Sequence, residues 1–104
     1  MQDNPLVSVR PSSIHGLGLF AAVDLYAGQL IGCYEGREVI RDGRYVLWVE
    51  EEDNLWTGYE GINCMRFLNH SDKPNAEMNH LECYALVAIP AGQEITIDYG
   101  WDET

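Results

Sequence analysis

The apolar residues of this chain come in short runs that are separated by turn-forming residues such as glycine, proline and asparagine. The shortness of these runs limits the possible fold more than any other feature of the sequence. No stretch places apolar residues at a sustained period of 3.6 between helix-capping residues. The ten glycines imply many turns. The pattern therefore predicts a mostly β domain made of small sheets, with little helix.

Six segments alternate in polarity or are rich in β-forming residues. The strands expected from them cover residues 6–10, 17–23, 29–34, 44–49, 82–89 and 94–99. The region 45–60 is the only candidate for a helix, and that helix would be short. The acidic run 50–53 is most simply a solvated turn, and 69–75 is rich in turn-forming residues.

The length of 104 residues predicts one domain, 1–104, because two domains would each be too small to hold a core. Hydrophobic residues make up 46% of the sequence, which is a globular composition and excludes a disordered chain. A domain of this size buries roughly 60–65% of the surface that its unfolded chain exposes, which leaves little stability to spare. A partner subunit, such as a second copy in a homodimer, therefore fits the sequence.

The chain is strongly acidic, since six Lys and Arg face seventeen Asp and Glu for a net charge of -11. Direct binding of nucleic acid or of an anionic membrane surface is not expected, because both need basic side chains. A Lys- or Arg-rich protein or peptide is the partner that this charge attracts. The alternative, which charge alone leaves open, is that the acidic residues only keep the protein in solution.

The three cysteines, Cys33, Cys64 and Cys83, are widely spaced and form no CxxC pair. They offer no zinc pattern and no disulfide framework, and we interpret them as small buried apolar residues in a reducing compartment. The polar start of the sequence does not resemble a signal peptide, and no apolar run approaches the ~20 residues that cross a bilayer. We therefore expect a soluble intracellular protein.

Four segments carry the residue types that sites use: His15-Gly-Leu-Gly-Leu-Phe20, Tyr34-Glu-Gly36, Arg66-Phe-Leu-Asn-His-Ser-Asp-Lys-Pro-Asn75 and Gly92-Gln-Glu-Ile-Thr-Ile-Asp-Tyr-Gly100. Taken singly, each fits a turn, a bulge or a half-buried strand end better than a site. Together and in this order, they resemble the SET-domain protein lysine methyltransferases. The resemblance runs from about Leu6 to Asp102, and the length is similar to that of the minimal SET proteins of viruses and bacteria.

The resemblance implies an activity, a cofactor and a fold. The family moves a methyl group from S-adenosyl-L-methionine (SAM) to a lysine amine by in-line displacement, which needs a neutral amine, alignment and a site that excludes water. The implied fold is a β-clip of small antiparallel sheets with a C-terminal pseudoknot, in which residues 69–70 pack against the segment that carries Tyr99. The implied substrate is a basic protein or a histone-like tail, and the implied location is cytoplasmic or nuclear and chromatin-associated.

The resemblance also implies the cofactor-binding residues. These are Gly16, Leu17, Gly18, Asn69, His70 and Tyr99. Glycines without a Cβ let backbone groups approach the methionine part of SAM. The amide of Asn69 would hydrogen-bond the amino-acid end of the cofactor, since it offers both a donor and an acceptor. His70 would contact the adenine largely through its backbone, and a general-base role for His70 is a separate hypothesis.

Two tyrosines match catalytic or channel positions of the family. Tyr99 matches the catalytic tyrosine, whose hydroxyl would act by orientation and electrostatics because a phenol with a pKa near 10 is a poor base at pH 7. Tyr34 matches a tyrosine that lines the lysine channel. Met78 and Trp101 complete the expected channel, although Trp101 fits a packing residue equally well. Met78 stands where the family often has an aromatic residue, so the number of methyl groups added is left open.

Three further residues of the matched motifs are expected to be structural. Arg66 would pair with an acid or with carbonyl groups, Phe67 would lie in the core, and Asn75 would bond the backbone around its turn. An acidic rim formed by residues 50–53 and Glu60 suits a Lys- or Arg-rich tail, and its alternative is a solvated loop.

The sequence ends at Thr104, whereas many family members continue into a cysteine-rich segment that binds zinc and covers the site. We therefore expect no zinc, and some other element, such as a second copy of the chain, to cover the site. Two alternatives to the enzyme remain open: a catalytically inactive SET-fold module that binds basic peptides, and an acidic structural subunit. Binding of SAM separates the enzyme from both.

Overall fold

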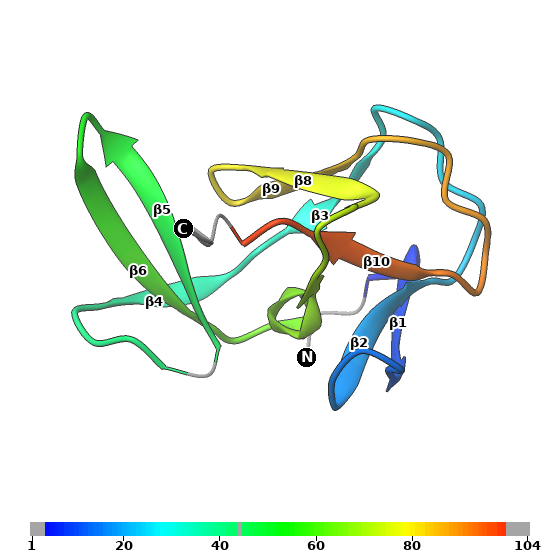
Figure 1. The fold of residues 1–104 in the computed structure, drawn as a ribbon, viewed down its shortest axis with the longest axis horizontal. Helices are drawn as coiled ribbons and strands as arrows, with labels where there is room; N and C mark the ends of the chain where they lie inside the picture. Colours follow the sequence, from blue (N-terminus) through cyan, green and yellow to red (C-terminus); the bar gives the residue numbers. More distant parts are fainter. Residues whose placement is uncertain (1–3, 44, 100–104) are drawn as a thin grey trace.

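The computed structural model describes residues 4–43 and 45–99, and over these residues the chain folds into three small β-sheets and one 3-10 helix (Figure 1). The strands are β1 (Val7–Pro11), β2 (Leu17–Ala21), β3 (Leu30–Cys33), β4 (Gly36–Val39), β5 (Val46–Glu52), β6 (Leu55–Gly61), β7 (Asn69–His70), β8 (Ala76–Asn79), β9 (Glu82–Ala85) and β10 (Glu94–Ile97), and the helix η1 spans Cys64–Phe67. The expected mostly β fold is confirmed. No helix within these ranges is long and apolar enough to cross a membrane.

The first sheet joins segments that are far apart in the sequence, in the strand order β1-β2-β10-β7. Strand β10 is antiparallel to β2, where Ile95 pairs with Leu19, and parallel to β7, where Thr96 pairs with Asn69. The last strand is therefore inserted between two earlier ones, as expected for the C-terminal pseudoknot. This insertion sets β7 beside the segment that leads to Tyr99.

The second and third sheets are antiparallel. Strands β3, β9 and β8 form one, in which Met78 pairs with Cys83. Strands β4, β6 and β5 form the other, which projects from the body of the molecule at the left of Figure 1. At its base, Gly36 pairs with Gly61, and a Cβ on Gly61 would lie 2.6 Å from the Tyr34 hydroxyl oxygen. The glycine therefore lets this tyrosine approach the sheet closely.

The core lies where the first two sheets and η1 meet. Its largest fully buried side chains are Leu19, Ile31, Met65, Cys83, Ile89 and Ile95. Alternation along β10 places Ile95 and Ile97 in this core, as its sequence pattern predicts. Phe67, which was expected in the core, is only half-buried, because the 3-10 turn directs Met65 and Leu68 inward instead.

The expectation of a short helix within 45–60 is wrong, since this region forms the β5–β6 hairpin. The acidic run 50–53 is not a turn either, because Glu50, Glu51 and Glu52 belong to β5. Val46, Trp48 and Val49 are β-branched or aromatic, which favours a strand. The turn is formed at Asn54, which has a φ of 63°, a left-handed conformation that asparagine tolerates well. The Glu50 carboxylate accepts the Asn54 N–H at 3.0 Å and so stabilises the turn. A turn signal at asparagine therefore outweighed the weak helical pattern.

Candidate active site

Three consecutive residues, Leu68, Asn69 and His70, connect two groups of side chains that the sequence places far apart. Asn69 contacts the loop before β2, His70 contacts the backbone of Tyr99, and the Leu68 carbonyl accepts the Tyr99 hydroxyl. The pairing of β7 with β10 holds these contacts in register. The residues expected to bind the cofactor and those around Tyr99 therefore meet at one short segment.

The Asn69 side chain is buried and its orientation is fixed. Its Nδ2 donates to the carbonyl oxygens of His15, at 3.2 Å, and Leu17, at 3.1 Å, and to Glu94 Oε2, at 2.8 Å. Because Nδ2 faces these acceptors, Oδ1 must point the other way, and no donor among the described residues reaches it. Asn69 therefore presents an acceptor, rather than a donor, to whatever binds beside the loop.

Glu94, on β10, holds the loop at 15–18 in place, although no motif gave this residue a role. Its two carboxylate oxygens accept the Ser12 hydroxyl at 2.8 and 2.9 Å, in addition to the Asn69 amide. A Cβ on Gly18 would collide with this carboxylate, which is why the second glycine of the loop is needed. Gly16 has a φ of 47°, which only glycine adopts readily. The loop is therefore held to β10 by a charged side chain.

The His70 ring serves to position Tyr99. Its Nδ1 accepts the Tyr99 backbone N–H at 3.0 Å, and its Nε2 lies 3.0 Å from Asp72 Oδ1. An Nδ1 that accepts a hydrogen bond carries no proton, so the neutral ring has its proton on Nε2, directed at Asp72. The Nδ1 lone pair is thus already used by Tyr99, which argues against the general-base hypothesis for this histidine.

Tyr99 is anchored at both ends. Its backbone is held by His70, its ring packs edge-on against the His70 ring at 5.4 Å, and its hydroxyl donates to the Leu68 carbonyl. Burial raises the pKa of the Tyr99 hydroxyl above its ordinary value, so the group keeps its proton at neutral pH. Because that proton is donated to Leu68, the oxygen can act toward other groups only as an acceptor.

A pocket of about 380 Å3 opens beside Tyr99. Of the four residues expected to form a substrate channel or its catalytic wall, Tyr34, Met78 and Tyr99 line it, while Trp101 lies outside the described residues. Tyr45, Leu47 and Met65 line it as well. The structure thus brings together residues from β5, β8, η1 and the C-terminal segment around one opening.

Tyr34 lies in the wall of this pocket with its hydroxyl already engaged. The side chain is buried, and its oxygen lies 2.6 Å from the Tyr45 carbonyl and 3.2 Å from the Tyr59 carbonyl. Burial raises the pKa of Tyr34 to about 12. The hydroxyl therefore ties the β5–β6 hairpin to the body of the protein, which favours a positioning role over the catalytic role expected from the sequence.

Two further residues lie near the pocket: Tyr45, which no motif indicated, and Arg66, which was expected to be structural. Tyr45 lines the pocket, yet it stands in no motif and has no signal beyond its place before a strand. The Arg66 guanidinium lies 5.6 Å from the Tyr45 ring centre and 4.5 Å from that of Phe67, and it donates to the Asn63 carbonyl at 3.0 Å. Its expected pairing with a carbonyl group is confirmed.

Asn75 also has the structural role that was expected. Its Nδ2 donates to the Glu94 carbonyl and its Oδ1 accepts the Thr96 N–H, both at 2.8 Å. It therefore holds the turn after β7 against β10.

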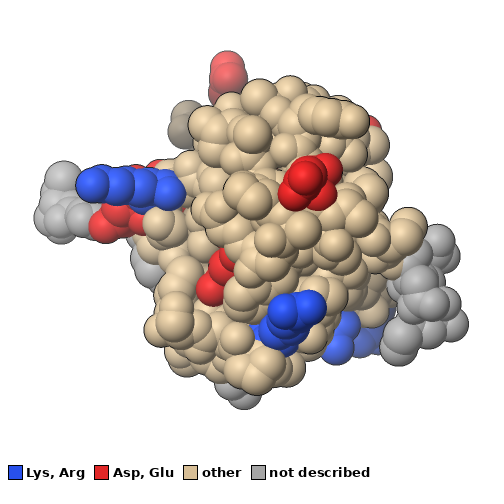
Figure 2. Space-filling view, turned by 90° about the vertical axis from the view of Figure 1, so that its right-hand side faces the viewer, with Lys and Arg blue, Asp and Glu red and all other residues tan. Residues whose placement is uncertain are grey.

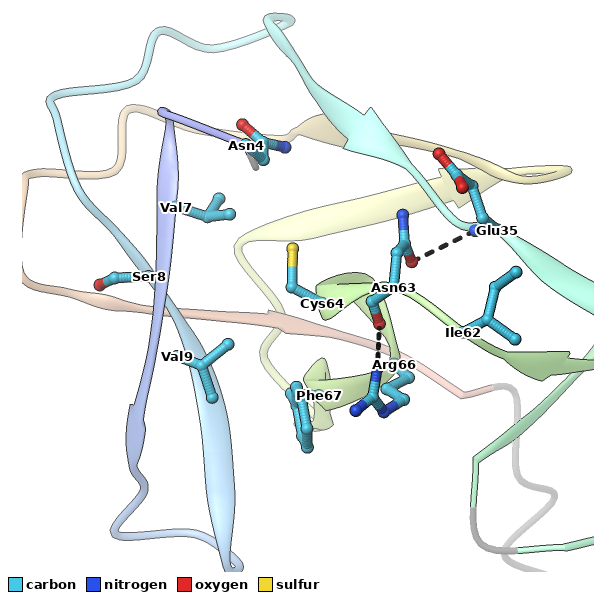
Figure 3. A pocket seen from close by; sticks show the side chains of 10 residues that line it. All are labelled: Asn4, Val7, Ser8, Val9, Glu35, Ile62, Asn63, Cys64, Arg66 and Phe67. Atoms are coloured by element: carbon cyan, nitrogen blue, oxygen red, sulfur yellow. Dashed lines mark hydrogen bonds between the residues drawn. The ribbon is translucent and has the colours of Figure 1, made fainter. Parts of the chain in front are cut away.

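A larger hollow of about 640 Å3 lies beside Arg66, between β1 and η1. Figure 3 shows Val7 and Val9 directed toward it and Ser8 directed away. Asn63 lines it and braces its wall, since its Oδ1 accepts the Glu35 N–H at 3.3 Å and its Nδ2 donates to the Cys33 carbonyl at 2.9 Å. None of the sequence-predicted cofactor, catalytic or channel residues line this hollow. Over residues 4–43 and 45–99, no group of His, Cys, Asp and Glu is arranged to hold a metal ion.

Comparison with protein families gives a match to the SET domain over residues 16–100. Human histone-lysine N-methyltransferase 2B is 32% identical over 115 residues, which cover 89% of this chain and 4% of the human protein. The putative histone-lysine N-methyltransferase 1 of Plasmodium falciparum is 31% identical, over 95% of this chain and 2% of that protein. The chain thus spans only a small part of the length of these relatives.

Solved structures share the fold. The methyltransferase domain of human PR domain-containing protein 2 superimposes with a TM-score of 0.72 at 18% identity, covering 96% of this chain and 80% of that one. A putative histone methyltransferase of Plasmodium falciparum gives a TM-score of 0.71 at 22% identity, covering 92% and 98%. In both cases the likeness extends over nearly the whole of this chain.

Proposed function

The chain belongs to the SET-domain family, and we propose that it is a protein-lysine N-methyltransferase that uses SAM as its methyl donor. One observation carries the proposal: the contacts of residues 68–70 join the loop at 15–18 to a tyrosine that stands in a pocket. A two-substrate transfer needs two adjoining sites of this kind, one for the donor and one for the acceptor.

The first group of residues suits the amino-acid end of SAM, which carries an ammonium group and a carboxylate. Asn69 presents its amide oxygen, which can accept from an ammonium, and the Glu94 carboxylate beneath it favours a cation nearby. When bound, SAM supplies a methyl group on a positively charged sulfur. Gly16, Leu17, Gly18 and the backbone of His70 would complete this site, as the family resemblance implies.

The second group suits a lysine side chain. Aromatic walls from Tyr34, Tyr45 and Tyr99 accommodate an alkyl stem that ends in a nitrogen. Lysine has an ordinary pKa of about 10.4 and must lose a proton before it can act as a nucleophile. Burial among the aromatic and apolar side chains of the pocket would favour the neutral amine because it disfavours the charged form. The pocket would therefore help to deprotonate the lysine that enters it.

Tyr99 would act as a fixed acceptor at the meeting point of the two groups. Because its proton is donated to Leu68, its oxygen would face the reacting groups as an acceptor. A preorganised oxygen of this kind stabilises positive charge on the transferring group and orients the amine. Tyr34 would hold the hairpin wall in place. The flexible Met78 side chain leaves the size of the pocket adaptable.

The proposed substrate is a basic protein or a histone-like tail. The net charge of -11 supports a Lys- or Arg-rich partner, and the relatives are named for action on histone lysines. Direct contact with nucleic acid is not part of the proposal, because the same charge repels phosphates.

Titration of SAM into isotope-labelled protein, followed by amide NMR, tests the donor site directly. We expect shifts at residues 16–18 and 69–70, and a weaker affinity in Asn69→Ala. Shifts elsewhere only, or unchanged affinity in Asn69→Ala, would contradict the assignment of this site. If millimolar SAM produced no shifts even with a lysine-rich peptide present, the chain would instead be a binding module without turnover.

A further inference from the structure

Two exposed tryptophans join the tyrosine pocket to a second hollow on the hairpin sheet. Trp48 and Trp56, which are 37% and 55% exposed, both line the pocket beside Tyr99. Both also line a hollow of about 760 Å3, together with Val39 and Ile40. The two indole rings therefore border both hollows. We call the second one the tryptophan cleft, defined by Val39, Ile40, Trp48 and Trp56.

Trp48 is held as a flat platform. It pairs across the sheet with Gly58, and a Cβ on that glycine would lie 3.0 Å from Trp48 Cη2 and 3.1 Å from its Cζ3. The ring therefore lies directly over the bare backbone of β6. Its Nε1 donates to Asp42 Oδ1 at 3.0 Å, which fixes the in-plane orientation. One face of the indole is packed on the strand, and the exposed part of the ring borders the cleft.

Trp56 stands on the same face of the sheet as Trp48. The register pairs Trp48 with Gly58 and Glu50 with Trp56, so the two tryptophans are diagonal neighbours, roughly 7–8 Å apart at their Cα atoms. Because Gly58 has no side chain, nothing from β6 fills the space between them. Glu50, directly opposite Trp56, brings a carboxylate to the same face.

Charge decides which kind of group this cleft suits. The face of the molecule turned away from the hairpin shows few charged side chains (Figure 2). The hairpin sheet and the loop before it carry many acidic ones: Glu38, Asp42, Glu50, Glu51, Glu52, Asp53 and Glu60. Of these, Glu38 lines the cleft directly, as does one cation, Arg41. Aromatic faces on an acidic sheet, with one carboxylate at the cleft itself, attract a cation, and a planar guanidinium can stack on an indole while it pairs with a carboxylate.

We propose that the tryptophan cleft binds a second basic side chain of the substrate protein, preferably an arginine, close in sequence to the lysine that enters the tyrosine pocket. This rests on the proposed function, since the pocket is taken as the lysine site. The arginine would stack on Trp48 or Trp56, with its alkyl stem along Val39 and Ile40. The cleft would thus select lysines that have an arginine nearby.

Binding of fluorescent peptides, measured by anisotropy without SAM, tests the cleft. Each peptide carries one lysine and one arginine at a varied separation, and in a matched set citrulline replaces the arginine and removes its charge. At the preferred separation we expect citrulline to weaken binding about two- to tenfold. Because Trp56 also lines the tyrosine pocket, Trp56→Ala should weaken both peptides and remove the difference in affinity between the arginine and citrulline peptides.

Leu55→Ala is the matched control. Leu55 is also 55% exposed and adjoins Trp56 in the sequence, but alternation along β6 places it on the opposite face of the hairpin. It should bind both peptides as the wild type does. The proposal is overturned if citrulline has no effect at any separation, or if Trp56→Ala and Leu55→Ala behave alike. It is also overturned if Trp56→Ala changes the sedimentation of the free protein, since a second copy would then occupy the cleft.

The two proposals fail separately. If binding depends on the arginine but no methyl-lysine forms, the proposal for the cleft is supported and the proposed methyltransferase activity is refuted. If methyl transfer occurs at the same rate with arginine and citrulline peptides, and their affinities are equal, the activity stands and the cleft does not.

Discussion

At the scale of single residues, the candidate site depends on hydrogen bonds that fix direction more than on unusual side chains. His70 directs Tyr99 through one ring nitrogen, and Glu94 directs Asn69 through one carboxylate oxygen. In each pair, the residue that would meet a substrate is oriented by a partner that would not. Changing His70 should therefore mainly alter the rate of transfer, and changing Glu94 should mainly alter the affinity for SAM.

For His70, the expected effect of a change is on the rate of transfer. His70→Ala removes the acceptor for the Tyr99 N–H and should lower kcat by about 10²-fold, since small misplacements of reacting groups have effects of this size. His70→Asn keeps an acceptor near the Nδ1 position and should recover much of that loss. Steady-state kinetics at saturating SAM provide the measurement. Equal kcat values in the alanine and asparagine variants would show that the ring does not position Tyr99.

For Glu94, the expected effect is on cofactor affinity. In Glu94→Gln, one of the two oxygens becomes an NH2 group, which cannot accept from either Ser12 or Asn69. The lost charge-assisted bond should weaken SAM binding about tenfold or more. Calorimetry of SAM binding measures this, with Glu77→Gln on the exposed edge of β8 as the control. If both variants bound SAM as the wild type does, the support of the loop by Glu94 would be refuted.

The motifs located Gly16, Asn69, Tyr34 and Tyr99 in advance, but not how they are held. Glu94 lies 25 residues from Asn69 in the sequence and His70 lies 29 from Tyr99, so no local pattern could pair them. The same reason explains why Tyr45 was missed and why Tyr34 was assigned to the channel without its bonds to the hairpin. Residue identity predicts which chemistry is available, whereas direction depends on tertiary contacts.

At the scale of elements, the β5–β6 hairpin forms one wall of the tyrosine pocket and is tied to the body by Tyr34. Tyr34→Phe removes the bond to the Tyr45 carbonyl and should lower the free energy of unfolding by about 1 kcal/mol. If Tyr34 only positions the hairpin, the variant should keep most of its kcat. A loss of kcat as large as that in Tyr99→Phe would instead restore its catalytic role.

The pKa of Tyr34 gives this bond a dependence on pH. Because burial raises it from 10.0 to about 12, the folded protein keeps the phenol proton at pH values where the unfolded chain has lost it. The contribution of this group to the free energy of unfolding is fully present below pH 10 and is lost as the pH rises toward 12. Chemical denaturation across this pH range should show that the free energy of unfolding falls more steeply for the wild type than for Tyr34→Phe. Parallel curves would contradict the burial of this hydroxyl.

Elements were predicted best where the local pattern was strong. The strands at 17–21 and 94–97 were expected close to their limits, because both are rich in apolar and β-forming residues and are bounded by turn residues. Strand β7 was not expected, since residues 69–70 form a strand only through their pairing with β10. Strands β4, β6 and β8 were missed because each is paired with a neighbour and has little alternation of its own.

At the scale of the whole molecule, the distribution of charge should govern how a basic substrate is captured. The substitutions Glu50→Gln, Glu51→Gln and Glu52→Gln, made together, keep acceptors for the bonds to Asn54 and Tyr59 while removing three charges. We expect slower association of a basic peptide at low salt and little change at high salt, where the screening length falls to a few ångströms. Stopped-flow association rates at two salt concentrations measure this. No difference at either salt would mean that these residues are only a solvated edge of the hairpin.

The central claim is that the chain transfers a methyl group from SAM to lysine, and the most direct measurement is mass spectrometry of a lysine-rich protein incubated with the enzyme and methyl-labelled SAM. The account predicts labelled methyl-lysine with the wild type, and at least about 10²-fold less with Tyr99→Phe at unchanged SAM affinity. If SAM is bound but no basic protein gains a labelled methyl-lysine, or if Tyr99→Phe transfers methyl groups as fast as the wild type, the account is contradicted.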